Sequence, residues 1–162
     1  GELRDRETIE LALKAAETGH LVFSTLHTND AVQTIYRVIN TFPPHEQDTI
    51  RLALANSLKG CLAQRLVPRC DRPGRVPAVD FLICTSTAKD AILKNEIDKL
   101  YEVEKQGLLE GMQSMNQSLY NYYKMGVIDW DMAMSYSENP AELIAMLRNH
   151  VRAMYQPAGS AV

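Results

Sequence analysis

The stretch ETGHLVFSTLHTND, from Glu17 to Asp30, places the tightest limits on what this chain folds into. Its centre, Leu21 to Leu26, is a short and mostly apolar run, the pattern of a buried strand in a parallel sheet. Gly19 precedes the run at a position that commonly ends a helix, and Asn29 or Asp30 follows it as a helix cap. A strand between two helices predicts an α/β layer.

The rest of the chain alternates helical and strand patterns. Asp5 is the expected N-cap of the first helix, and Asn139, followed by Pro140, is that of the last. A stripe of Ile50, Leu54, Leu58 and Leu62 predicts a helix over 45–66. The remaining expected elements are a helix over 31–42, a turn over 69–75 flanked by segments that can pair as a hairpin, a strand over 76–84 and helices from residue 86 onward.

This order of elements predicts an α/β fold with few strands, followed by a helical part. We expect one unit over residues 1–85, a helical subdomain over 86–155 and a disordered tail over 156–162. The chain of 162 residues carries a net charge of −3, which gives no strong field for nucleic acid, so no nucleic-acid partner is expected. No apolar run approaches the roughly 18 residues that span a bilayer.

Two histidines bracket the expected strand. His20 and His27 are seven residues apart, so on a straight strand they face opposite sides and lie roughly 23 Å apart. This geometry argues against one metal held by His20, His27 and Asp30, as a metal hydrolase requires.

The carboxyl end of a strand is where open α/β sheets bind ligands. His27 lies at that end with Thr25 and Thr28, and the helix that begins near Asp30 is expected to present free N–H groups beside it. His20 lies at the other end, where a structural hydrogen bond is expected. Taken alone, a histidine at a strand end is more often packed or solvated than functional.

Glu2 is a second candidate, because a carboxylate before a helix is where nucleotide hydrolases hold a water of Mg²⁺. The phosphate-binding pattern GxxxxGK[ST] occurs nowhere in the chain, and neither does GxGxxG. The residues alone therefore indicate no means of gripping a triphosphate.

Longer stretches carry a resemblance. GELRDRETIELALKAAETGHLVFSTLHTNDA resembles the Walker B end and histidine box of the secretion ATPase superfamily, which are hexameric RecA-like motors. VINTFPPHEQDTIRLALANSLKGCLAQRLVPR and GMQSMNQSLYNYYKMGVIDWDMAMSYSENPAEL resemble the retraction ATPases of type IV pili, the PilT and PilU type. The paired CxxC motifs of type II secretion assembly ATPases are missing. Residues 88–94 read AKDAILK where the PilT type has AIRNLIR, which favours the PilU type or a divergent relative.

The resemblance implies the C-terminal half of a RecA-like P-loop NTPase core and its helical subdomain. It implies an ATPase that powers pilus retraction with ATP and Mg²⁺ in a longer parent protein, whereas this chain alone is expected to bind neither and to be inactive. Glu2 matches the Walker B acid and would hold Mg²⁺ through water, and His27 would contact the γ-phosphate. Thr25 and Thr28 would join His27 in nucleotide binding, and His20 would be the structural histidine.

The same resemblance implies the surroundings of the parent. It would be a homo-hexamer at the cytoplasmic face of the inner membrane, bound to the membrane only through partners. Those partners would be the pilus platform protein and a paralogous motor ATPase.

Two other interpretations stay open. One is a non-catalytic helical interaction module derived from a secretion ATPase. Met112, Met115, Leu119 and Tyr122 form a stripe that is core by default and that could instead be a partner groove. The other is a fragment of a type II secretion or pilus assembly ATPase.

Overall fold

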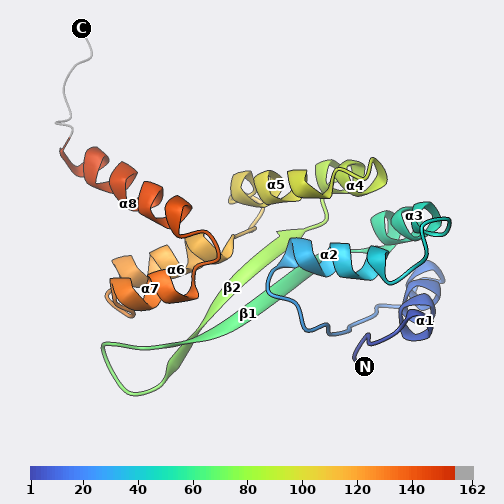
Figure 1. The fold of residues 1–162 in the computed structure, drawn as a ribbon, viewed down its shortest axis with the longest axis horizontal. Coiled ribbons are helices and arrows are strands. Elements are labelled where there is room, and N and C mark those ends of the chain that lie inside the picture. The colour runs from blue at the N-terminus through green and yellow to red at the C-terminus, as the bar shows by residue number, and fades with distance from the viewer. Residues whose placement is uncertain (156–162) are drawn as a thin grey trace, which may run out of the picture. The chain divides into compact units, whose positions relative to one another are not determined.

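The computed structural model describes residues 1–155, and side chains as far as residue 149. The expected tail over 156–162 lies outside the described residues. The described part consists of helices and one two-stranded sheet of β1 and β2 (Figure 1), which confirms the α/β class with few strands.

The chain divides into two compact units. Unit 1 comprises Gly1–Gln64 and Val79–Ser114, and unit 2 comprises Arg65–Ala78 and the chain from Met115 onward. The division at residue 85 that the sequence suggests stays a prediction. The elements are α1 (Arg6–Glu17), α2 (Ala31–Asn40), α3 (Gln47–Ser57), β1 (Gly60–Pro68), β2 (Arg75–Ile83), α4 (Ser86–Leu93), η1 (Ile97–Lys99), α5 (Leu100–Gln106), α6 (Met115–Lys124), α7 (Trp130–Tyr136) and α8 (Pro140–Tyr155).

Helix α1 has the predicted ends. The Asp5 carboxylate accepts from the Thr8 backbone N–H at 2.8 Å, and the Thr8 hydroxyl accepts from the Asp5 N–H, which makes a reciprocal capping box. After the helix, Gly19 adopts φ +92°, where a side chain would be strained. The caps of α2 at Asp30 and of α8 at Asn139 are confirmed in the same way.

Replacing Asp5 by Ala is expected to lower the free energy of unfolding of the chain by about 1 kcal/mol, because it leaves N–H groups at the start of α1 without their acceptor. Urea titration followed by circular dichroism measures the change. Glu7→Ala is the matched control, since it removes the same charge from the exposed first turn of α1 but touches no cap. Equal losses in the two variants would contradict the capping role.

The predicted helix over 45–66 is wrong in its second half. Helix α3 ends at Ser57, Leu58 is extended, and β1 begins at Gly60. In β1 burial alternates, with Cys61, Ala63 and Val67 buried, so the strand period replaces the helical one. Leu62, expected on the helical stripe, is 60% exposed. The spacing of apolar residues was compatible with both periods, and pairing with β2 selects the strand.

The predicted buried strand over Leu21–Leu26 is also wrong. The structure has a single parallel bridge there, between Glu2 and Thr25, and the side chain of Phe23 is 83% exposed. A strand needs successive hydrogen bonds to a neighbour, and the described chain offers this segment only the N-terminal residues around Glu2 and Leu3. The segment is therefore extended but does not form a regular strand.

The segments around the predicted turn do pair as a hairpin. The Arg69 N–H donates to the Gly74 carbonyl at 3.1 Å, which closes the loop between β1 and β2. Within the loop the Arg69 guanidinium binds the Asp71 carboxylate through two hydrogen bonds of 2.8 and 2.6 Å. Gly74 takes φ +121°.

Unit 1 buries one apolar face from each of its helices. Helix α2 contributes buried residues that recur at helical spacing and so lie on one face of the helix. They are Ala31, Val32, Ile35, Val38 and Ile39. Fully buried side chains of this core include Val32, Ile35, Leu82, Ile92, Ile97 and Leu100.

Unit 2 has its own core, formed by the hairpin segment Arg65–Ala78 together with α6, α7 and α8. Met115 and Leu119 are buried, and the Tyr122 hydroxyl donates to the Pro77 carbonyl at 3.0 Å. Met112 is buried in the core of unit 1. Met112, Met115 and Leu119 are therefore core residues and do not form a partner groove.

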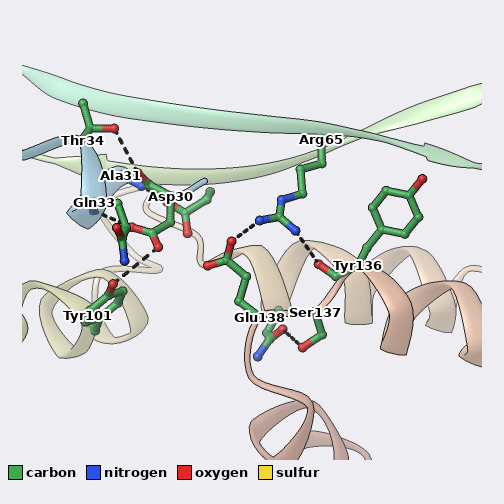
Figure 2. Close-up of polar contacts among 11 residues, drawn as sticks. Asp30, Ala31, Gln33, Thr34, Arg65, Tyr101, Tyr136, Ser137 and Glu138 are labelled. Atoms are coloured by element: carbon green, nitrogen blue, oxygen red, sulfur yellow. Dashed lines mark hydrogen bonds and ion pairs between the residues drawn. The ribbon is translucent and has the colours of Figure 1, made fainter. Parts of the chain in front are cut away.

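A polar network fixes the start of α8 within unit 2. The Asn116 side-chain NH₂ donates to the Asn139 carbonyl and to the Glu142 carboxylate, at 3.0 and 2.8 Å. The Ser137 hydroxyl donates to the Asn116 side-chain oxygen Oδ1 at 2.6 Å. Arg65 of β1 pairs with the Glu138 carboxylate and donates to the Tyr136 carbonyl (Figure 2).

Candidate functional site

The N-terminal residues lie beside the segment that carries His27. The Leu3 N–H donates to the Thr25 carbonyl at 2.9 Å, and the Ser24 hydroxyl donates to the Gly1 carbonyl. This pairing is parallel, so both segments run toward the same end. It brings Glu2 next to the residues that follow Thr25.

The carboxylate of Glu2 lies between the side chains of Arg4 and His27. Its Oε2 is 2.7 Å from Arg4 Nη2, and its Oε1 is 3.2 Å from His27 Nε2. The hydrogen bond from Arg4 is the largest effect and lowers the pKa of Glu2. Burial, the second largest, opposes it, and the charges of Arg4, His27 and Arg37 lower the pKa further. Glu2 is therefore an ionised carboxylate, able to accept hydrogen bonds from a water or from an imidazolium.

The imidazole of His27 is open to solvent. Its side chain is 84% exposed, so within the described part of the chain the contact with Glu2 and the backbone position orient the ring. The Thr25 side chain is exposed as well. The Thr28 hydroxyl is instead 2.7 Å from the Thr34 hydroxyl of α2, which occupies part of its hydrogen-bonding capacity.

His20 is not part of this cluster. Its Nδ1 lies 3.1 Å from the Thr18 hydroxyl and 3.2 Å from the Ala15 carbonyl, at the end of α1. The structure thus brings Glu2, Thr25 and His27 together and leaves His20 bonded to the helix end. Its proposed role as the structural histidine of the site stays a prediction.

The N-terminus of α2 has fewer free N–H groups than expected. The Asp30 carboxylate accepts from the Gln33 N–H at 2.6 Å and from the Tyr101 hydroxyl at 3.4 Å (Figure 2). The Ala31 N–H donates to the Asp80 carboxylate of β2 at 2.9 Å. The expectation that this helix end offers open donors to a ligand is therefore wrong at these two amides, because acidic side chains already occupy them.

Sequence reasoning missed a buried acidic cluster behind that helix end. Asp30, Asp80 and Glu104 are each 4% exposed or less, and Glu104 shares a hydrogen bond with Asp80. Burial, followed by the charge of Asp80 and the bond to it, raises the pKa of Glu104 to about 9. Within the described residues the Glu104 Oε1 has no hydrogen-bond partner. The one signal in the sequence is that Glu104 falls four residues after Leu100, on the buried face of α5.

A buried thiol beside the same cluster stays protonated. Burial raises the pKa of Cys61 to about 12, and the charges of Cys84, Asp80 and Glu104 contribute. Cys61 is therefore an inert core residue rather than a nucleophile.

A polar cleft of about 400 Å³ opens beside His27 along one face of α2. Amide, hydroxyl, imidazole and guanidinium groups line it, which suits an anionic or hydroxylated ligand better than an apolar one. The lining residues are His27, Thr28, Asn29, Gln33, Tyr36, Arg37 and Asn40. None of the described helices is long and apolar enough to cross a membrane.

A family model described as "Type II/IV secretion system protein" matches residues 1–162. The chain belongs to this family. The "Twitching motility protein" of Neisseria gonorrhoeae is 41% identical over 139 residues, which are 86% of this chain and 37% of that protein. In Pseudomonas aeruginosa, the "Type IV pilus ATPase PilU" is 37% identical over 91% of the chain and 39% of its own length. The PilT retraction ATPase of the same organism is 39% identical over 86% of the chain and 40% of its own length.

Solved structures agree with the sequence relatives. The crystal structure of the pilus retraction motor PilT with bound ADP has a TM-score of 0.81 and 45% identity, over 90% of this chain and 40% of that one. The ATPase DotB of Legionella pneumophila has a TM-score of 0.71 and 27% identity, over 90% of this chain and 37% of that one. The chain therefore spans about two fifths of the length of these relatives. The fold and the resemblance to retraction ATPases are confirmed.

Similarity to an assembly ATPase covers less of the chain. The "Type IV pilus assembly ATPase PilB" of Acinetobacter baylyi is 44% identical over 94 residues, which are 56% of this chain and 15% of that protein. The match to the retraction relatives is longer at comparable identity.

Proposed function

We propose that this chain is the C-terminal part of the motor domain of a hexameric ATPase that drives type IV pilus retraction. The observation that carries the proposal is the 3.2 Å contact between the Glu2 carboxylate and the His27 imidazole, which lie 25 positions apart in the sequence. A carboxylate and an imidazole that share one solvent-facing edge are suited to hold a metal-bound water and a terminal phosphate. The long match to retraction relatives favours this motor type over an assembly ATPase.

In this proposal each residue of the site has its own role in ATP hydrolysis. Glu2 stays ionised beside Arg4 and accepts a hydrogen bond from a water in the metal's shell. His27, whose Nε2 contacts Glu2, presents its exposed imidazole ring toward the γ-phosphate, and the Thr25 and Thr28 side chains flank it. Bound Mg²⁺ supplies positive charge that offsets the charge developing on the phosphoryl oxygens. ATP and Mg²⁺ belong to the parent protein.

Loss of the phosphate would be transmitted through the segment between Thr25 and α2. Asp30 caps α2 and binds Tyr101 of α5, so a shift of this segment reaches two helices of unit 1. In the parent ring such a shift would rotate one subunit against the next and pull on pilin. The proposed partners are the inner-membrane platform protein and a paralogous motor, at the cytoplasmic face of that membrane.

Phosphate release at saturating ATP and Mg²⁺ tests the proposal. We expect turnover from the full-length parent and none from the 162-residue chain, because the chain has no GxxxxGK[ST] loop to hold the phosphates. Turnover by the chain alone would contradict its proposed inactivity. A full-length parent that binds ATP but never hydrolyses it would contradict the motor and favour an interaction module.

A further inference from the structure

Arg37 reaches from α2 to the backbone of His27. Its Nη1 donates to the His27 carbonyl oxygen at 2.9 Å, across ten positions of sequence. The residue lies in the last turn of α2, and its side chain is exposed. The hydrogen bond to this backbone carbonyl restrains the exposed Arg37 side chain next to the candidate site.

The segment that carries His27 has few other anchors. On one side the Thr25 carbonyl accepts from Leu3, and on the other Asp30 caps α2. Between them, the bond from Arg37 holds the His27 carbonyl, the contact with Glu2 holds its ring, and the Thr28 hydroxyl lies 2.7 Å from the Thr34 hydroxyl of α2. Arg37 follows Asp30 by seven residues, about two helical turns, so it projects from the same face of α2 as the cap.

The charge of Arg37 also bears on Glu2. The hydrogen bond from Arg4 is the main cause of the lowered pKa of Glu2, and the charge of Arg37 contributes with that of His27. Arg37 lines the polar cleft together with His27. A guanidinium has five N–H donors, and the His27 carbonyl occupies one of them in the structure.

We infer that Arg37 is a positioning residue that holds His27 against Glu2. The inference rests on the proposed function, because the value of this orientation lies in the contact of His27 with the terminal phosphate. Arg37 acts through His27: its bond to the carbonyl sets the backbone, and the backbone sets the ring. Loss of the bond releases an imidazole that is otherwise exposed to solvent.

A double-mutant cycle in the full-length parent tests the inference. We expect Arg37→Ala and His27→Ala each to lower kcat at least about tenfold, since misplacement of a group by about 1 Å costs up to 100-fold. The double variant is expected to match His27→Ala alone, because Arg37 acts only through that ring. KM for ATP stays within about threefold, and Arg37→Lys keeps most of the rate, because one cationic donor suffices for one carbonyl.

Arg72→Gln is the matched control, since Arg72 is an exposed arginine in the hairpin loop. It should leave kcat and the melting temperature unchanged. Losses that multiply in the double variant, or an Arg37→Ala enzyme with wild-type kcat, would overturn the inference. So would equal losses of rate and melting temperature in Arg37→Ala and Arg37→Lys, which would mark a merely structural role.

A second measurement separates this inference from the proposed function. In the 162-residue chain, Arg37→Ala is expected to move the ring resonances of His27 in a ¹H–¹³C spectrum and to leave those of His20 and His45 in place. Unmoved His27 resonances overturn the inference whatever the parent's activity. A moved resonance together with a His27→Ala parent of normal kcat supports the positioning contact and overturns the role proposed for His27.

Discussion

Replacing Glu2 by Gln is expected to lower kcat of the full-length parent at least about 100-fold, since removing one group that stabilises a transition state costs 10²–10³. Gln has the shape of Glu, and its amide oxygen can still accept from Arg4, whereas its NH₂ group replaces the oxygen that faces His27. It lacks the negative charge that holds a metal-bound water. The loss should therefore fall on kcat, with ATP binding within about threefold of wild type.

The measurement is steady-state phosphate release over a range of Mg²⁺ concentrations, with ATP binding followed separately. Glu7→Gln is the control, because Glu7 is an exposed acid on α1 five positions along the chain. It should behave as wild type. A Glu2→Gln enzyme within fivefold of wild type, with unchanged Mg²⁺ dependence, would remove Glu2 from the mechanism.

The second large effect is the pH dependence of the free energy of unfolding that Glu104 causes. The pKa of Glu104 is raised from 4.5 to about 9 in the folded chain, chiefly by burial and then by Asp80. Between these values the folded chain binds one proton more than the unfolded chain, so the free energy of unfolding falls as pH rises. The stabilisation is complete below the unfolded pKa and lost as pH rises through the folded value.

Glu104→Gln is expected to abolish this dependence. Gln resembles the protonated acid and its NH₂ can donate to Asp80, so no buried charge forms at high pH. Between pH 5 and pH 9 the wild-type melting temperature should fall at least about 4 °C further than that of the variant, equivalent to more than about 1 kcal/mol for a chain of this size. Differential scanning calorimetry of the 162-residue chain measures both profiles.

The groups around Glu104 support the choice of variant. Asp80 and Asp30 add negative charge from β2 and the cap of α2, Lys105 opposes them from α5, and Cys61 stays neutral with its pKa of about 12. Glu102→Gln is the control, because Glu102 is an exposed acid on the same helix, paired with Lys105 at 3.4 Å. Parallel profiles for wild type and Glu104→Gln would mean that Glu104 is ionised in the fold.

Local chemistry made the starts of three helices predictable. Asp5, Asp30 and Asn139 accept backbone N–H groups three residues ahead, so each cap is decided within one turn of chain. The hairpin is predictable from its turn composition for the same reason. The resemblance of the long motifs to retraction ATPases depended only on residue identity, and the comparisons confirmed it.

The elements that were mistaken depend on distant partners. Residues 58–66 fit a helical stripe as well as a strand, and pairing with β2 decided for the strand. Leu21–Leu26 has the composition of a buried strand, yet only the residues around Glu2 pair with it in the described chain. Composition measures what a segment prefers, and a neighbouring strand decides whether that preference is realised.

In the candidate site, too, some features follow from the sequence and others only from the tertiary structure. By itself the sequence determined which side chains are available, Glu2, Thr25 and His27 among them, and that a turn and a helix follow His27. Only the tertiary structure decided that Glu2 lies 3.2 Å from His27, that Arg37 binds the His27 carbonyl, and that Asp80 and Glu104 are buried together. Caps and turns form within a few residues, whereas these contacts join residues 10 to 25 positions apart, whose approach is set by the packing of the whole unit.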